Sequence, residues 1–577
     1  MIQALIQRWL AGQDPSAPEA RQKCGARAGM VGILLNTLLC LGKLAAGMIT
    51  GSVAIVADAL NNLSDAASSV ITLVGFRLAG QAADEEHPFG HGRMEYLTGL
   101  VVSMAILLMG FELGKSSVEK LIHPEELEAL APRAEKAAQA VRKIRTEGKA
   151  KHHLSKDGTP EPVYFTRLPY VKKDFPNTPE LLQELKAFGE KVRIQEDAVI
   201  FCGVGGSYLG GKVLYDCYTS EYWPKRHRER LPQIFFSGNN LDAEDMDGVK
   251  NHLMVLAQQS KALQQRPLRV LLVPISKSGT TLEPTAAFLH FYSYLQEQDH
   301  LFQVSGAVVT DKQQEKGPLN RLSREYSWPV FDIPVGVGGR FSVLSTPGLV
   351  VAAVLGMDLE DLLRGAREMD EACRGSQLDQ NPALFNAVLK YAGAVNHGAV
   401  TEVFMPYAMR MKALGEWYVQ LLAESLGKRK NREGETVFYG RTPVVAIGTT
   451  DMHAQTQLHQ DGRRDKVVQF LFIDNMKNRI HIHNPFQEIE EYTQYEGLDI
   501  GHALKVAMEA NEEALASDFR LNALYTLPEL NEYYLGQMFY FLMLSIAYEG
   551  ELADVDAYDQ PGVEIYKRLM REKLKKG

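Results

Sequence analysis

The sequence has few cysteines, no excess of basic residues and no long uninterrupted apolar run. Its five cysteines are scattered and form no Cys-x-x-Cys pair, which argues against a disulfide framework and fits a reducing compartment. The formal net charge of -9 argues against a nucleic-acid-binding surface. We expect the basic cluster KRKNR, residues 428–432, to be a solvated helix end. What remains is a chain of 577 residues with 23% charged residues, long enough for several domains with buried cores.

Apolar residues concentrate near the N-terminus. Residues 28–42, 44–57 and 96–111 are free of charge, although none of these runs reaches the roughly eighteen residues of an unambiguous membrane span. The first two join across Lys43 into a stretch rich in Gly, Ala and Ser, which let membrane helices pack closely. We therefore predict about three transmembrane-like helices and membrane association through residues 28–120. A buried helical hairpin is the alternative.

Polar side chains interrupt this region in two places. VADALNNLSDAASS puts Asp58, Asn62 and Asp65 on one helical face, where carboxylates in an apolar helix suggest an ion path. DEEHPFGHGRMEYL has a spacing that suits a divalent metal. Both stretches resemble the first three membrane helices of the cation diffusion facilitator family. The metal-site candidates are Asp58, Asn62, Asp84, His87 and His91. The family's fourth to sixth helices have no counterpart here, so we expect these residues to be vestigial and the segment to lack transport activity.

The rest of the chain alternates apolar runs, polar loops and helical patterns. The predicted strands lie in residues 198–202, 270–275, 305–311, 401–407, 444–451 and 467–475. This order predicts an α/β fold with parallel sheets, covered by helices on both faces and binding ligands at the carboxyl ends of the strands. We expect five parts: 1–126 before the junction, a lead-in at 127–184, α/β units at 185–355 and 381–512, and a helical C-terminal part at 513–577.

Two loops after predicted strands are candidates for ligand binding. GVGGSYLGGK has Tyr208 where a dinucleotide fingerprint needs its third glycine, which weakens a dehydrogenase interpretation. SKSGTT, residues 276–281, supplies hydroxyl and N–H groups beside a helix N-terminus, which suits a phosphate monoester. A helix-capping cluster explains the same residues equally well.

Four later motifs add candidate side chains. Arg340 follows two glycines, Gln420 and Glu424 share a helical face, and His453 stands just beyond a strand end. DQPGVEIYK carries Gln560 and Lys567 near the C-terminus. Each side chain alone has an ordinary explanation as a surface or loop residue. In this order and with these neighbours, the motifs from about residue 127 onward closely resemble the glucose-6-phosphate isomerase family.

That resemblance implies a fold, a reaction and a set of site residues. The fold would be two sugar-isomerase (SIS) subdomains, and the reaction would interconvert glucose 6-phosphate and fructose 6-phosphate through a cis-enediol. Sugar and substrate contacts would come from Gly206, Ser207 and Gln420, and phosphate contacts from Ser276, Lys277, Ser278 and Thr281. Glu424 would be the base, Arg340 would stabilise the enediolate, and His453 and Lys567 would open the ring. We expect no cofactor. We also expect the isomerase part to form a homodimer.

Three other functions remain open at this point. One is a dual phosphoglucose/phosphomannose isomerase, another a membrane cation transporter with a sugar-phosphate-sensing SIS domain, and the third a noncatalytic SIS binding module. The stretch KLIHPEELEALAPRAEKAAQAV has no Gly/Ser- or Pro-rich linker, so we place a junction of two unrelated proteins near Glu126. We expect the activity to lie after this junction and, because its substrates are phosphorylated sugars, in the cytoplasm.

Overall fold

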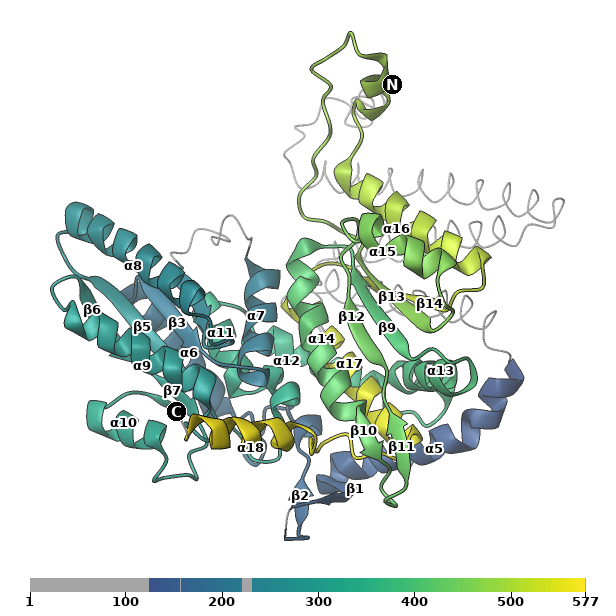
Figure 1. Cartoon of the computed structure of the whole chain (residues 1–577), viewed down its shortest axis with the longest axis horizontal. Helices are drawn as coiled ribbons and strands as arrows, with labels where there is room; N and C mark the ends of the chain where they lie inside the picture. The colour runs from purple at the N-terminus through teal and green to yellow at the C-terminus, as the bar shows by residue number, and fades with distance from the viewer. Residues whose placement is uncertain (1–123, 156, 220–230, 576–577) are drawn as a thin grey trace, which may run out of the picture. The chain divides into compact units, whose positions relative to one another are not determined.

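The computed structural model describes residues 124–155, 157–219 and 231–575. This part of the chain forms two parallel four-stranded sheets flanked by helices, which confirms the predicted α/β class (Figure 1). The predicted membrane spans and the metal-site candidates from Asp58 to His91 lie outside these residues. Among the helices of the described ranges, none is long and apolar enough to cross a membrane.

The first sheet has the strand order β4-β3-β5-β6. Its strands are β3 (Ala198–Cys202), β4 (Gln233–Ser237), β5 (Leu268–Pro274) and β6 (Phe302–Gly306). Its helices are α6 (Pro179–Gln195), α7 (Gly206–Tyr218), α8 (Ala243–Gln264), α9 (Leu282–Glu297) and α11 (Thr346–Leu355). All five residues of β3 are buried, as its continuous apolar run predicts for a strand covered on both faces.

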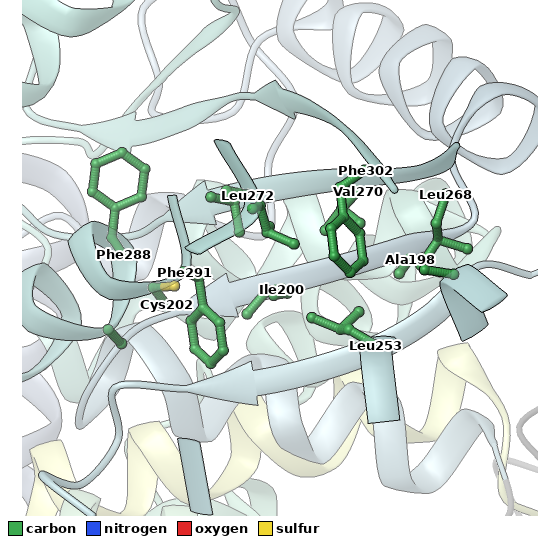
Figure 2. Close-up of a cluster of buried hydrophobic side chains, with 13 residues drawn as sticks. Ala198, Ile200, Cys202, Leu253, Leu268, Val270, Leu272, Phe288, Phe291 and Phe302 are labelled. Atoms are coloured by element: carbon green, nitrogen blue, oxygen red, sulfur yellow. The ribbon is translucent and has the colours of Figure 1, made fainter. Parts of the chain in front are cut away.

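The core of the first sheet lies on both of its faces. Figure 2 shows Ile200 and Leu272 of the strands gathered with Phe291 of α9 in one buried cluster. Alternate side chains of a strand point to opposite faces. Phe201 accordingly lies outside this cluster and stacks on Phe236 of β4, with 5.6 Å between ring centroids. Burial on both faces sets the register of the strands, so the loops after β3 and β5 emerge at one edge of the sheet.

The second sheet has the strand order β12-β9-β13-β14. Its strands are β9 (Thr401–Pro406), β12 (Thr442–Val445), β13 (Lys466–Ile473) and β14 (Asn522–Leu527). Its helices are α13 (Pro382–Asn396), α14 (Lys412–Leu426), α15 (Met452–Asp461), α16 (Ile500–Ser517) and α17 (Glu532–Leu552). The C-terminal part, which we expected to be helical from residue 513, contains β14. That strand pairs along β13 from Asn522 to Leu527 and completes the sheet.

Helices join the two sheets into one packed body. α17 is buried along most of its length and packs against α5, α12, α13 and α14, while α7 of the first sheet packs against α14 of the second. The remaining helices are α5 (Pro124–Glu147), α10 (Pro318–Tyr326), α12 (Leu359–Ala372), α18 (Val563–Leu574) and the 3-10 helices η1 (Phe165–Arg167), η2 (Gly339–Leu344), η3 (Leu378–Gln380), η4 (Met409–Met411) and η5 (Glu490–Tyr495). The short strands are β1 (Lys149–Leu154), β2 (Pro160–Pro162), β7 (Val308–Thr310), β8 (Val330–Asp332), β10 (Lys428–Lys430) and β11 (Thr436–Tyr439).

A buried network of charges ties the second sheet to α13 and α17. Glu402 of β9 is fully buried, and it accepts hydrogen bonds from Lys390 Nζ at 2.6 Å and Arg441 Nε at 2.9 Å. Arg441 Nη2 also donates to Glu549 Oε2 of α17 at 2.8 Å. Burial raises the pKa of the Glu402 carboxyl, but the two cations outweigh it and hold the pKa below its ordinary value. The network therefore depends on every charge having its partner.

Removing one cation from this network should lower the stability of the fold. Lys390→Met leaves a buried carboxylate with one of its two cations, and we expect the free energy of unfolding to fall by about 3–5 kcal/mol. Urea denaturation measures the change. Lys186→Met is the matched control, because its pair with Glu360 is exposed and should contribute less than about 1 kcal/mol. Equal stability of the two variants would contradict this account of the network.

Candidate active site

Two loops leave the first sheet side by side at its carboxyl edge. One connects β3 to α7, and the other connects β5 to α9; β3 and β5 are paired neighbours. In the sheet, β4 lies on one side of β3 and β5 lies on the other. The winding direction of the chain therefore reverses between β3 and β5. Open α/β sheets bind ligands at such a switch point. The structure therefore brings Gly206 and Ser207, which begin α7, to the same edge as the loop that starts at Ser276.

The loop after β5 is folded around its own hydroxyl groups. The buried Ser276 Oγ accepts the Gly279 N–H at 3.1 Å, and Ser278 Oγ accepts the Thr280 N–H at 3.2 Å. Gly279 has φ +66°, a left-handed conformation that favours glycine. Thr281 stands at the N-cap of α9, but its side chain makes no capping hydrogen bond. The capping interpretation therefore loses its main support. Lys277 and Ser278 are exposed beside this helix N-terminus, where an anion would gain from the helix dipole.

Arg340 is the most buried charged group near these loops. It lies in η2 and is 1% exposed. A guanidinium has five N–H groups, and all five of these donate hydrogen bonds. The acceptors are Ser425 Oγ at 2.8 Å, Glu424 Oε2 at 3.2 Å, Gln560 Oε1 at 3.1 Å and the carbonyl oxygens of Ala557 at 2.7 Å and Asp559 at 3.0 Å. Burial lowers the pKa of Arg340, and the Glu424 carboxylate opposes that change.

Glu424 and Gln420 occupy the last turns of α14, as their spacing predicts. Gln420 Nε2 donates to Glu424 Oε1 at 3.1 Å, so each carboxylate oxygen of Glu424 accepts one hydrogen bond. The Glu424 side chain is 26% exposed and remains reachable from solvent. A Cβ atom at Gly205 would lie 3.0 Å from Gln420 Nε2, which places Gln420 against the loop after β3. Its Oε1 is buried without a hydrogen-bond partner in the described residues, so one acceptor is left for a ligand.

A close contact between two glycines holds Arg340 beside the first sheet. A Cβ atom at Gly206 would lie 2.0 Å from the carbonyl oxygen of Gly339, the residue before Arg340. Ser342 Oγ donates to this same carbonyl oxygen at 2.7 Å. Glycine is therefore needed at the start of α7 so that η2 can approach it.

The structure does not bring His453 to Glu424. His453 is exposed and begins α15, beyond the carboxyl end of β12. α14 starts near this end, because a Cβ atom at Gly415 would lie 2.8 Å from Val445 of β12. Glu424 follows about 14 Å farther along the helix, at roughly 1.5 Å per residue. Within one chain, His453 and Glu424 therefore lie toward opposite ends of α14.

Lys567 lies on α18, and its own contacts do not join it to Glu424. Its Nζ is 3.9 Å from Glu564 Oε1, and its side chain is 38% exposed. The neighbouring Tyr566 lies closer to the site. Partial burial raises the pKa of Tyr566, and so do the negative charges of Glu283 and Glu424. α18 therefore brings Tyr566 within electrostatic reach of Glu283 on α9 and Glu424 on α14.

The sequence interpretation missed the role of residues after Glu424. KRKNR is not a solvated helix end: Lys428 is 6% exposed, and Arg432 donates to Glu551 Oε2 at 2.6 Å. A signal was present, because Lys428 continues the i, i+4 series of Gln420 and Glu424. Ser425 was missed as well. Within the described ranges, no three His, Cys, Asp or Glu side chains gather closely enough to hold a metal ion.

The chain is similar to known proteins over most of its length. The phosphoglucose isomerase family model matches residues 115–576, and the cation efflux transmembrane domain model matches residues 29–132. The glucose-6-phosphate isomerase of Carboxydothermus hydrogenoformans is 36% identical over 407 residues, 69% of this chain and 82% of that protein. The glucose-6-phosphate isomerase of Rubrobacter xylanophilus is 32% identical over 411 residues, 71% of this chain and 88% of that protein. The crystal structure of a glucose-6-phosphate isomerase from Chlamydia trachomatis matches with a TM-score of 0.62 at 21% identity, covering 79% of this chain and 86% of that one.

The glycine contact gives a test that needs no assay of function. Gly206→Ala should lower the free energy of unfolding by about 1–3 kcal/mol, the usual cost of forcing extra atoms into a packed site. Gly248→Ala in α8 is the control. A Cβ atom there meets nothing within 4 Å, so the helix should become more stable by about 0.5–1 kcal/mol. Thermal unfolding of both variants measures the two opposite shifts. A neutral or stabilising Gly206→Ala would contradict the close approach of η2.

Proposed function

The chain belongs to the phosphoglucose isomerase family, and from this premise we propose that it interconverts glucose 6-phosphate and fructose 6-phosphate at the site around Arg340. The observation that carries the proposal is the hydrogen bond between a buried guanidinium and a carboxylate that solvent can reach, Arg340 and Glu424. This pair lies beside the loops at the switch point of the first sheet. The chemistry of an aldose–ketose isomerase needs one base and one fixed positive charge, which this pair supplies.

Glu424 would move the proton. Its carboxylate takes the proton from C2 of the open-chain sugar, which breaks the C2–H bond and leaves a cis-enediolate. A proton then moves from the C2 hydroxyl to the C1 oxygen, and Glu424 returns its proton to C1 as the C2 carbonyl forms. To reach the sugar carbons, the carboxylate has to turn away from Arg340 Nη1. That N–H group then becomes free for the enediolate oxygen, while the other four remain on their acceptors. Arg340 would thus stabilise the developing charge with a donor that is already oriented and cannot lose its proton.

The two loops of the first sheet would hold the rest of the substrate. Ser276, Lys277, Ser278 and Thr281 supply hydroxyl, N–H and ammonium groups at the N-terminus of α9, a suitable setting for the phosphate dianion. Gly206 and Ser207 would line the sugar together with Gln420, whose Oε1 has no partner among the described residues. The reaction moves a proton and transfers no hydride, so we predict that it needs no cofactor.

Ring opening would require a second copy of the chain. His453 and Lys567 are the proposed acid–base pair for this step, yet His453 lies at the far end of α14 from its own Glu424. We infer a homodimer in which the partner subunit's His453 completes each site. The excursion between β13 and α16 carries exposed apolar side chains that suit such an interface, and they are Ile480, Phe486, Tyr492 and Tyr495.

The finer domain division is part of the proposal. The two sheets with their helices would be SIS subdomains, at 185–355 and from 381 to beyond β14, preceded by the lead-in at 127–184. Residues 1–126 would contribute no transport. The substrates place the reaction in the cytoplasm, and membrane association through residues 28–120 remains part of the expectation.

Replacing the base tests the proposal directly. Glu424→Gln should lower kcat by about 10²–10⁴-fold, the typical contribution of a general base, because the amide cannot accept the C2 proton. Conversion of fructose 6-phosphate to glucose 6-phosphate, followed in a coupled assay, measures the loss. Glu416→Gln in the same helix is the control, because its side chain is 41% exposed and it pairs with Lys412 instead of Arg340. Retained turnover in a folded Glu424→Gln chain would rule out the assignment.

Mixing two inactive variants tests the shared site. In a mixed dimer of Glu424→Gln and His453→Ala chains, one site combines both defects and the other has a complete set of residues. We therefore expect unfolding and refolding the two variants together to restore a substantial part of the wild-type activity. Each variant refolded alone should stay inactive. If His453 acts within its own chain, the mixture will remain inactive.

A further inference from the structure

Lys428 is a buried ammonium with all of its donors engaged. It lies one turn beyond Glu424, and its side chain is 5% exposed. Its Nζ donates to the carbonyl oxygen of Glu424 at 2.9 Å, to the carbonyl oxygen of Asp559 at 2.6 Å and to Asp559 Oδ1 at 2.7 Å. An ammonium has three N–H groups, so none is left for a substrate. Lys428 therefore cannot act as a binding group, and its contacts are all with the protein around the carboxylate.

These contacts join two parts of the site that are far apart in the sequence. The Glu424 carbonyl belongs to the last turn of α14, where helix carbonyls lack partners within the helix. Asp559 precedes Gln560, whose Oε1 accepts from Arg340 Nη1 at 3.1 Å. The carbonyl oxygen of Asp559 also accepts from Arg340 Nη2 at 3.0 Å, so Arg340 and Lys428 share one acceptor. Two cations thus hold residues 559 and 560 against α14.

The preceding residues are anchored independently of Lys428. Asp556 Oδ2 pairs with His153 Nδ1 at 2.9 Å. Tyr558 is held among aromatic rings, with its ring centroid 6.0 Å from Phe165 and 5.9 Å from Phe341. Loss of Lys428 would therefore leave the chain in place up to Tyr558 and leave Asp559 and Gln560 held by Arg340 alone. The Asp559 side chain is 41% exposed, so water can replace the lost ammonium there.

Burial of this ammonium has a cost that points to a role. Burial lowers the pKa of Lys428, although the Asp559 carboxylate opposes the change. Exposed cations avoid that cost, as Arg429 and Lys430 do on the same strand, β10. At this position the charge serves to orient two backbone carbonyls and one carboxylate around the site.

We propose that Lys428 is a positioning residue that, together with Arg340, fixes Asp559 and Gln560 beside Glu424 and so limits the access of water to the Glu424 carboxylate. The inference rests on the proposed function, since it concerns the proton that Glu424 carries between C2 and C1. During that transfer, the protonated carboxyl either returns the original proton to C1 or first exchanges it with solvent. The balance between the two outcomes reports how well water is excluded.

The test is the fraction of product that carries solvent deuterium. Glucose 6-phosphate is converted in D₂O at low conversion, and mass spectrometry gives the ratio of labelled to unlabelled fructose 6-phosphate. We expect Lys428→Met to raise this ratio by about tenfold, in line with the loss of hydrogen bonds to a charged group. Lys428→Arg, which keeps the charge and several donors, should stay closer to wild type. A loss of folded enzyme alone would lower turnover and leave the ratio unchanged.

Arg145→Met is the matched control for removing a buried cation. Arg145 donates to Asp370 Oδ1 at 2.8 Å, to the Tyr548 hydroxyl and to the Cys373 carbonyl, none of which belongs to residues 557–560, so this variant should be less stable with an unchanged ratio. If Lys428→Met does not fold, Asp559→Asn takes its place in the test. This substitution removes the Asp559 carboxylate and keeps the Asp559 carbonyl oxygen. The inference would be overturned if Lys428→Met or Asp559→Asn turned over substrate with an unchanged ratio of labelled to unlabelled product. An equal rise of this ratio in Arg145→Met would overturn it as well. Absence of turnover in the wild-type chain would instead refute the proposed function.

Discussion

The Arg340 guanidinium holds together elements that are far apart in the sequence. It is buried, and its five hydrogen bonds reach the last turn of α14 and the segment that follows α17. A buried charge is tolerated only when its hydrogen-bonding capacity is met, so each N–H group needs an acceptor from the protein or from the substrate. The same requirement that stabilises the fold therefore fixes the position of Glu424. Through Gly339 and its contact with Gly206, it also fixes the distance from this carboxylate to the first sheet.

The two sheets contribute unequally to this arrangement. The first provides a switch point, where the loops after β3 and β5 offer backbone N–H and hydroxyl groups to an anion. The second provides α14, whose far end carries the carboxylate, and α17, which leads into the segment that accepts from Arg340. The charge network around Glu402 and Glu549 anchors β9 to α17. Stability of the second sheet and geometry of the site are thus coupled through α17.

Local sequence patterns predicted much of this architecture. They failed where contacts between distant parts of the chain determine whether a segment forms a strand or a side chain is buried. AVIFC was predicted as a strand because continuous burial leaves an apolar run, and β3 occupies those residues. β14 was missed because most of its residues are only half-buried and it lies between two helices. Lys428 was misread because a lysine in a basic cluster is usually solvated, and only the folded chain brings Asp559 to it. The separation of His453 from Glu424 likewise depends on where α14 and β12 lie.

A crystal structure with a phosphorylated hydroxamate that mimics the cis-enediolate would test the central claim most directly. The account predicts that the Glu424 carboxylate turns from Arg340 Nη1 toward the atoms that mimic C1 and C2, and that this N–H group meets a hydroxamate oxygen. The hydrogen bonds from Arg340 to Ser425, Ala557, Asp559 and Gln560 should persist, with the phosphate group in the loop from Ser276 to Thr281. An analogue bound away from this loop, with the pair of Arg340 and Glu424 unchanged, would contradict it.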